Sequence, residues 1–291
     1  MKPPPFEYVK ASTVTEAVAV LAQSDGEAKV IAGGQSLMPM MNFRLLSPSV
    51  LVDINGIRDL DYVRIEDGAL HVGALTRHHR LETSPTIAEQ FPVLRTAMAC
   101  VAHLAIRNRG TLGGSLSHAD PAAELPMMLV LLDGEIRIAG AGGERVVAAR
   151  DFFLGALTPD LEEDEILVEV RLPLLPRGSG WGFEEFAQRS GDFALAAAAA
   201  TVTLSQGTVS EARVALMGVD DTPLRLPAGE DLLRGRALDR DLINRVAALA
   251  RDAVNPNTDL HASADYRRHL AEVLTRRVLG QAWRRVAEEP S

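Results

Sequence analysis

Two short glycine-bearing loops carry the residues of this chain that are best suited to chemistry. They lie at residues 29–37 and 111–121, and they contain Gly33, Gly34 and Ser36 in the first loop and Thr111, Gly113, Gly114 and Ser115 in the second. Glycine lets bare backbone approach a ligand, and successive N–H groups in such a turn form a concave site for phosphate oxygens. Hydroxyl groups can add further hydrogen bonds. Two such loops together are predicted to bind both halves of a pyrophosphate, which indicates a dinucleotide ligand. The alternative is that each loop is a tight turn that packs backbone against backbone.

Two acidic residues and one aromatic residue stand near turns where they could contact such a ligand. Asp120 and Glu124 are four residues apart and would share a face of a helix. Asp120 could accept hydrogen bonds from ribose hydroxyls, or it could cap a helix with Pro121 in the first helical position. Phe193 follows a turn and could stack on a flat ring, although ordinary packing also explains it.

Other kinds of catalytic site find no support in the sequence. The single cysteine, Cys100, excludes an intrachain disulfide and a self-contained cysteine-ligated iron–sulfur or zinc site. The seven histidines have no H-x-x-x-H or H-E-x-x-H spacing, so no metal site is expected. No G-x-S-x-G elbow is present, and the acidic run Glu162–Glu165 is interpreted as a solvated connection. We therefore expect no catalytic nucleophile.

The elements that must position the two loops follow from hydrophobic patterning. A buried strand over 29–32 enters the first loop, and a helix over 92–106 ends just before the second. Thr13 and Glu16 have the spacing of a capping box, which predicts a helix start. Further strands are expected at 6–9, 50–54, 70–74, 135–138 and 166–172, and a helical or part-buried segment at 122–132. The dinucleotide fingerprint G-x-G-x-x-G is absent, so a Rossmann fold is not supported.

The pattern changes after a Pro/Gly/Ser-rich linker at 176–180. Strands are expected at 194–204 and 211–217, followed by helices at 239–254 and 265–279. In the last helix, Arg267, Arg268 and Arg276 lie mostly off the apolar stripe and are interpreted as a solvated face. Strands followed by helices predict an α+β domain.

The bulk properties limit the class of protein. The length of 291 residues is typical of about two domains. The formal net charge of −9 argues against a nucleic-acid surface, because phosphate binding needs clustered positive charge. The N-terminus lacks an apolar core followed by a cleavage site, and no uncharged run approaches the roughly 18 residues of a membrane span. We expect a cytoplasmic protein with no membrane span.

Taken together, the motifs resemble the FAD-binding medium subunit of the molybdenum hydroxylases, the group of carbon monoxide dehydrogenase and xanthine dehydrogenase. The matching segments occur in the family's order over nearly the whole chain: Ala32–Leu37, Leu51–Ile54, Thr111–Ser115, Asp120–Pro126, Glu165–Leu167, Arg189–Phe193 and Ser263–Leu270. Each segment is weak alone, whereas the ordered set is highly specific.

The resemblance implies an α+β fold with FAD as the cofactor. It implies a two-subdomain FAD-binding domain of the PCMH type at 1–175, with subdomains at about 1–56 and 57–175. An α+β C-terminal domain of the CO dehydrogenase flavoprotein type would follow at 181–291. The implied cofactor-binding set is Lys29, Val30, Ile31, Ala32, Gly33, Gly34, Gln35, Ser36, Leu37, Thr111, Gly113, Gly114, Ser115, Asp120, Glu124, Leu167 and Phe193.

The resemblance also implies a function and partners. In the relatives a large molybdopterin subunit oxidises the substrate and a small subunit carries two [2Fe–2S] clusters. The medium subunit passes the electrons through FAD to an external acceptor. A self-sufficient flavoprotein oxidoreductase and a non-catalytic assembly subunit are the alternatives. The chain departs from the family at Glu185, where some relatives carry lysine, so electrostatic tuning of the flavin from that side is not carried over.

Overall fold

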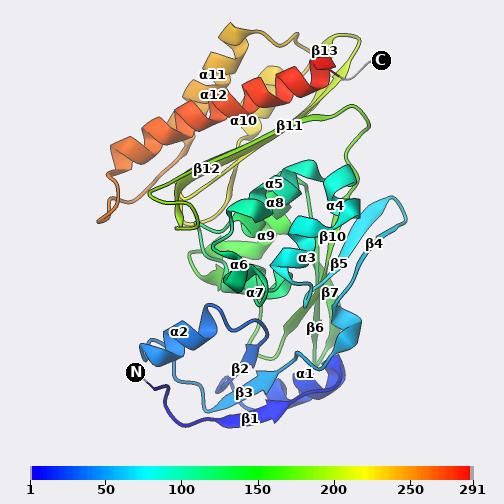
Figure 1. The fold of residues 1–291 in the computed structure, drawn as a ribbon, viewed down its shortest axis with the longest axis vertical. Helices are drawn as coiled ribbons and strands as arrows, with labels where there is room; N and C mark the ends of the chain where they lie inside the picture. The colour runs from blue at the N-terminus through cyan, green and yellow to red at the C-terminus, as the bar shows by residue number, and fades with distance from the viewer. Residues whose placement is uncertain (1, 289–291) are drawn as a thin grey trace.

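The computed structural model describes residues 2–288 and arranges them in three layers along the long axis of the molecule (Figure 1). The N-terminal layer is at the bottom of the view in blue. A larger layer follows in cyan and green, and the C-terminal layer lies at the top in yellow to red. Among the described residues, no helix is long and apolar enough to cross a membrane.

The N-terminal layer is a small parallel sheet with one long helix. Its strands run in the order β1 (Glu7–Lys10), β3 (Val50–Asp53) and β2 (Ala28–Ile31), and α1 (Val14–Gln23) packs against them. The Thr13 hydroxyl accepts from the Glu16 N–H at 3.1 Å, which confirms the predicted helix start. The Glu16 carboxylate accepts from the backbone N–H and the hydroxyl of Ser12, both at 2.7 Å, and it also interacts with the backbone of Thr13, as a capping box requires. The first glycine loop leads from β2 into the short helix α2 (Leu37–Asn42).

The middle layer is built on an antiparallel sheet. The order is β4 (Val63–Glu66), β5 (Ala69–Gly73), β10 (Ile166–Pro173), β6 (Glu135–Gly140) and β7 (Gly143–Ala148). Seven short helices belong to this layer: α3 (His78–Thr83), α4 (Pro85–Gln90), α5 (Pro92–Cys100), α6 (Leu104–Arg107), α7 (Leu112–His118), α8 (Glu124–Leu131) and α9 (Ala149–Phe152). The hairpin β8 (Phe153–Gly155) and β9 (Thr158–Pro159) stands beside them. Helix α8 is apolar on all sides after its first residue and is buried throughout.

Two helix predictions in this layer were wrong in their extent. The helix expected over 92–106 is divided into α5 and α6, because Ala102 adopts a left-handed conformation with φ of 42°. The helix expected from Ala122 begins at Glu124 with Ala123 as its N-cap. In the sequence, the two changes lie on either side of the second glycine loop.

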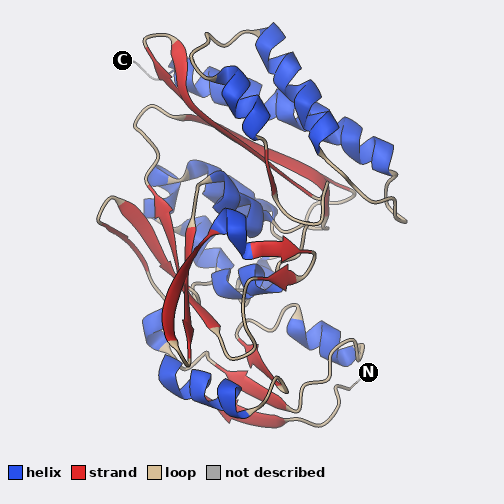
Figure 2. Ribbon diagram, turned by 180° about the vertical axis from the view of Figure 1, so that it is seen from behind, coloured by secondary structure: helices blue, strands red, loops and turns tan. Residues whose placement is uncertain are grey.

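The C-terminal layer is a four-stranded antiparallel sheet with helices on one face, as Figure 2 shows from behind. The strands are β11 (Gly180–Ala187), β12 (Ala194–Ser205), β13 (Thr208–Met217) and β14 (Leu224–Arg225), and the helices are α10 (Pro227–Leu233), α11 (Arg240–Ala253) and α12 (Ala264–Glu288). In β12, Ala197 and Ala199 join the core of the middle layer, whereas Ala196 and Ala198 join the core under the helices. Because successive side chains of a strand point to opposite faces, this one sheet contributes residues to two cores.

The two predicted strands and two predicted helices of this layer are present, but three expectations need correction. β11, β14 and α10 were not predicted, and α12 continues nine residues beyond the predicted end at residue 279, to Glu288. Arg267 is buried instead of solvated, because its guanidinium donates to the carbonyls of Leu195 and Gly218 and pairs with Asp259 at 2.7 Å. These hydrogen bonds and the ion pair offset the cost of burying the charged guanidinium.

Candidate functional site

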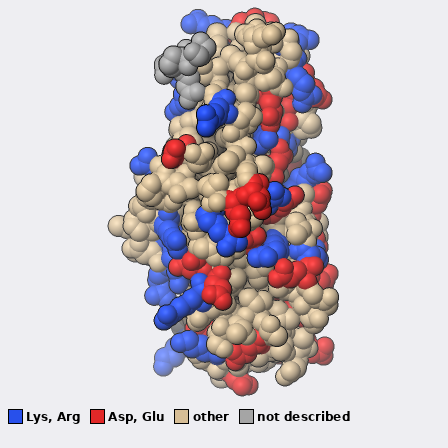
Figure 3. Space-filling view, turned by 90° about the vertical axis from the view of Figure 1, so that its right-hand side faces the viewer, with Lys and Arg blue, Asp and Glu red and all other residues tan. Residues whose placement is uncertain are grey.

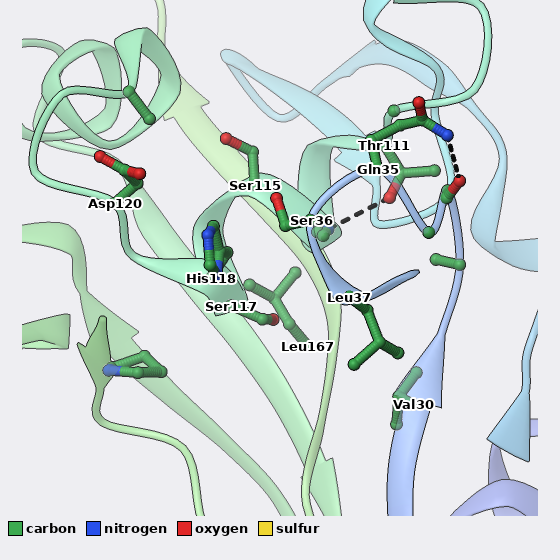
Figure 4. Close-up of a pocket in the computed structure, with 18 of the residues that line it drawn as sticks. Val30, Gln35, Ser36, Leu37, Thr111, Ser115, Ser117, His118, Asp120 and Leu167 are labelled. Atoms are coloured by element: carbon green, nitrogen blue, oxygen red, sulfur yellow. Dashed lines mark hydrogen bonds between the residues drawn. The ribbon is translucent and has the colours of Figure 1, made fainter. Parts of the chain in front are cut away.

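A cleft of about 640 Å³ lies where the three layers meet. The first glycine loop and β2 form one wall, α7 and the start of α8 form the other, and residues 191–193 of the C-terminal layer reach its edge. Figure 4 shows Ser36 and Leu37 from one side facing Ser115, Ser117 and Leu167 from the other. The volume lies within the usual range for small-molecule and cofactor sites.

The two glycine loops converge at this cleft, as the sequence predicted. A Cβ on Gly33 would overlap the carbonyl oxygen of Arg109 and lie 2.9 Å from the Cα of Gly110. Thr111 also forms an isolated antiparallel bridge with Arg77. Only glycine at position 33 lets the backbones approach this closely. Gly33 therefore packs backbone against backbone, which was the alternative interpretation of these loops.

The first loop has the free N–H groups expected of an anion-binding nest. The backbone N–H groups of Gly33, Gly34, Gln35 and Ser36 donate no hydrogen bond to other described residues. Gly34 has a φ of 70°, which is strained for any residue with a side chain. The Gln35 amide donates to the Gly33 carbonyl at 2.8 Å and so stabilises the turn. This loop can present several donors to one anionic group.

The second loop differs from its prediction, because its N–H groups are already used. Residues 112–118 form helix α7, and the Gly114 N–H donates to the hydroxyl of Thr111, the N-cap, at 3.1 Å. The Leu112 and Gly113 N–H groups donate to the Thr76 and Ala74 carbonyls at 2.9 and 2.8 Å. The prediction of a second backbone nest was therefore wrong. The loop instead offers hydroxyl groups, and Ser115 is the one that faces Ser36 in Figure 4.

Asp120 and Glu124 both line the cleft, but they do not share a helix face. The Asp120 carboxylate accepts from the Ala122 N–H at 2.8 Å within a turn, so its predicted role as the cap of α8 was also wrong. Burial, reinforced by the nearby Glu185 carboxyl group, raises the pKa of Glu124 to about 8. Burial also raises the pKa of Glu185 to about 7 and that of the Cys100 thiol to about 11. A thiol with such a pKa is a poor nucleophile, as expected for Cys100.

His78 supports the second loop from behind. Its Nε2–H donates to the Thr111 carbonyl at 2.9 Å, and its ring lies against Gly110, where a Cβ would come within 2.8 Å of Nδ1. Burial lowers the pKa of His78 to about 4, so the ring is neutral at neutral pH. The imidazole thus fixes the position of Thr111 without adding charge to the cleft.

Two apolar side chains line the cleft, the buried Leu167 and the exposed Phe193. Leu167 enters from β10, while Phe193 stands at the edge with 70% of its surface exposed. The turn before Phe193 is held against the middle layer, because a Cβ on Gly191 would come within 2.7 Å of the His103 ring. An exposed ring on a firmly held turn is available for stacking.

Most of the predicted site residues are brought together in this cleft. All of the expected cofactor-binding residues line it except Ile31, which belongs to the same strand but does not contribute to the wall. The sequence missed Ser117 and His118 on α7, and Glu162 and Glu163 on the opposite edge. The acidic run that holds these two glutamates is not simply solvated, because Glu165 pairs with Arg145 at 2.7 Å. The proximity of this run to the first loop had no signal in the sequence.

Comparison with known proteins places the fold and the cleft in one family. A family model described as the FAD binding domain in molybdopterin dehydrogenase matches residues 4–175. The chain belongs to this family. A second model, described as the CO dehydrogenase flavoprotein C-terminal domain, matches residues 181–282. The resemblance seen in the sequence and the α+β fold class are thereby confirmed.

Individual relatives of this molybdopterin dehydrogenase family match over almost their whole length. The 6-hydroxypseudooxynicotine dehydrogenase complex subunit alpha of Paenarthrobacter nicotinovorans is 43% identical over 98% of this chain and 97% of its own. A chain of the carbon monoxide dehydrogenase of Hydrogenophaga pseudoflava superposes with a TM-score of 0.96 and 39% identity, covering 98% of this chain and 99% of that one. A chain of quinoline 2-oxidoreductase from Pseudomonas putida 86 gives 0.93 and 41%, covering 98% and 100%.

The residues of the cleft fit the FAD expected of this family. The first loop supplies unused N–H donors, Ser36 and Ser115 supply hydroxyls, and the walls are otherwise largely apolar. FAD needs these three features for its diphosphate and its flat rings. The face in Figure 3 shows Lys and Arg intermixed with Asp and Glu, without a basic patch that would compete for a phosphate-rich ligand.

Proposed function

We propose that this chain is the FAD-binding medium subunit of a molybdenum hydroxylase complex. In this role it receives electrons from [2Fe–2S] clusters of a partner subunit and passes them through FAD to an external acceptor. The observation that carries the proposal is the unused N–H nest of the first loop, which opens into a cleft of cofactor size in a chain of this family. FAD supplies the redox chemistry, and the protein binds and orients it.

The roles of the predicted site residues follow from their positions in the cleft. The backbone of Gly33–Ser36, with the Ser36 and Ser115 hydroxyls, binds the diphosphate; Thr111, Gly113 and Gly114 hold Ser115 in place. Asp120 and Glu124 make polar contacts with the cofactor, while Leu167 and Phe193 pack against its rings. Lys29, Val30, Ala32, Gln35 and Leu37 complete the wall, and Ile31 supports them from β2.

The partners belong to the same proposal. The single cysteine cannot ligate a [2Fe–2S] cluster, which takes four protein ligands, so a small subunit has to supply the clusters and a large molybdopterin subunit the substrate site. The chain would divide into an FAD-binding domain at 1–175, with subdomains at about 1–56 and 57–175, and a C-terminal domain at 181–291. The ranges of the two family models support the main boundary. We also infer a cytoplasmic location.

The nest is tested by Gly34→Ala, which puts a side chain on a residue with φ of 70°. We expect FAD to dissociate at least tenfold more readily, measured by flavin absorbance and fluorescence titration, because the strained turn re-aims its N–H donors. The matched control is Gly207→Ala, since Gly207 has a φ of 79° but lies in the β12–β13 hairpin with open space around it. Unchanged FAD affinity in Gly34→Ala would contradict the proposal.

The purified wild-type protein also distinguishes the proposed function from two alternatives, an assembly subunit and a self-sufficient enzyme. Wild-type protein that is folded but takes up no FAD would indicate an assembly subunit. Oxidation of a small organic substrate by the isolated chain with FAD would indicate a self-sufficient enzyme. We expect flavin binding, together with substrate oxidation only after the partner subunits are added.

A further inference from the structure

Two carboxyl groups from different layers meet at the wall of the cleft. Glu124 is the first residue of α8 and lines the cleft, while Glu185 belongs to β11 of the C-terminal layer. Their side chains are in hydrogen-bonding contact with each other. The Oε2 atom of Glu185 is buried, and no group in the described part of the chain donates a hydrogen bond to it.

The charges around this pair are acidic or already paired. Asp120 is the other charged group that acts on Glu124, and Cys100 of α5 is near both carboxyl groups. Arg107 of α6 is held by Glu82 at 2.9 Å and by the Val101 and Ala102 carbonyls. His118, at the end of α7, also lines the cleft.

Glu184, which precedes Glu185 in β11, has a different environment. Glu184 points to the opposite face of β11, where it pairs with Arg277 at 2.5 Å and accepts from the Gln281 amide at 3.0 Å. Glu184 thus has a cation, and Glu185 has only another acid. Two adjacent buried carboxylates repel each other, and an oxygen–oxygen hydrogen bond between them requires a proton on one of the two.

We propose that Glu124 and Glu185 share one proton, so that the pair meets the occupant of the cleft with one negative charge instead of two. Glu185 is then a positioning residue, which acts on the occupant through Glu124. The inference rests on the proposed FAD site, because FAD is the occupant considered. The raised pKa of both groups agrees with the geometry.

Binding of FAD should then be linked to this proton. As the pH rises and the pair loses its proton, its charge changes from −1 to −2 beside an anionic cofactor, and the added repulsion opposes binding. The FAD dissociation constant should rise with pH over this range, by up to about tenfold per pH unit, which is the limit for one linked proton.

The shared proton can be measured without FAD. In the full-length, flavin-free protein at neutral pH, infrared spectroscopy should show the carbonyl stretch of a protonated carboxyl group that shifts in D₂O and disappears as the pH is raised. In Glu185→Gln the midpoint of this disappearance should move to lower pH by about one unit or more, because the repelling acid is gone. Glu184→Gln, the matched control, should leave it unchanged. Absence of the band in the wild type, or an equal shift in both variants, would overturn the proposal.

Titration of FAD at several pH values gives the second readout. The wild type should bind FAD more weakly as the pH rises. Glu124→Gln, which keeps a hydrogen-bond donor but cannot ionise, should bind with an affinity that stays flat over the same range and within about threefold of the low-pH wild type. A pH dependence that persists in Glu124→Gln overturns the role of the pair. If no protein binds FAD at any pH, the proposed function fails, and the infrared result still decides whether the proton is shared.

Discussion

At the scale of single residues, Gly33 and Gly34 are adjacent but serve different purposes. Gly33 is required because the backbone of 109–110 occupies the space of a side chain, whereas Gly34 is required by its positive φ. The sequence predicted the glycines and their neighbouring hydroxyls correctly as parts of one cleft. It could not predict that the N–H groups of Gly113 and Gly114 are already hydrogen-bonded within the protein. That depends on where the carbonyl of Ala74 and the hydroxyl of Thr111 lie in space.

The buried His78 makes stability depend on pH at the residue scale. Its folded pKa of about 4 lies below the ordinary value of 6.5, so the unfolded chain binds the proton more readily. The contribution of His78 is therefore fully present above pH 6.5 and is lost as the pH falls through 6.5 to below 4, by about 3 kcal/mol in total.

Denaturant unfolding at several pH values should show this loss in the wild type and a smaller loss in His78→Gln. The exposed His261 gives the control variant His261→Gln, which should follow the wild type. Parallel curves for the wild type and His78→Gln between pH 6.5 and 4 would rule out the assigned protonation.

At the scale of elements, short helices set the shape of the cleft, and one of them, α7, begins with a side-chain cap. Hydrophobic periodicity predicted most strands and the long helices, because one face of each is buried. It did not predict the break between α5 and α6, since Ala102 has no local feature that favours a left-handed conformation. It missed β11, where glycines at 180 and 182 interrupt the pattern; these glycines let the backbone of α12 come close. The burial of Arg267 was not predicted, because the carbonyl groups that accept from it, those of Leu195 and Gly218, are far away in the sequence.

The cap of α7 links stability to the site. Thr111→Ala removes the hydroxyl that accepts from Gly114 and should destabilise the protein by about 1 kcal/mol. It should also weaken FAD binding several-fold, because α7 carries Ser115. Thermal unfolding and FAD titration measure the two effects.

A second capping threonine provides the control for this prediction. Thr13 accepts from Glu16 at the start of α1, and neither residue lines the cleft. Thr13→Ala should lower stability by a similar amount and leave FAD affinity unchanged. Equal FAD affinities in the two variants would show that the cap of α7 does not position the site.

At the scale of the whole molecule, the three layers are joined by shared cores. The core of the middle layer includes Ala197, Ala199, Ala215 and Met217, which belong to the sheet of the C-terminal layer. The cleft draws on all three layers, so its shape depends on how they are packed. The order of the motifs along the chain predicted the family, but only the packing shows that residues on both sides of the proposed boundary near residue 176 belong to one core.

This arrangement predicts that residues 1–175 are poorly stable alone. Removing 176–291 exposes the apolar face of α5 and α8 that packs on β11 and β13. We expect the fragment to aggregate or to unfold at least 10 °C below the full chain, since exposed core surface costs about 25 cal/mol per Å². Circular dichroism melting and size-exclusion chromatography would test this. A monomeric fragment with the melting temperature of the full chain would contradict it.

The alanine run in β12 has one more consequence. Its side chains are short on both faces, and α8 and α12 pack on this strand from opposite sides. A bulkier residue at Ala198 would press on the helices, and one at Ala197 would press on the middle layer. Since α8 begins with Glu124, a change of a single methyl group in the strand could alter the width of a cleft that the strand never touches.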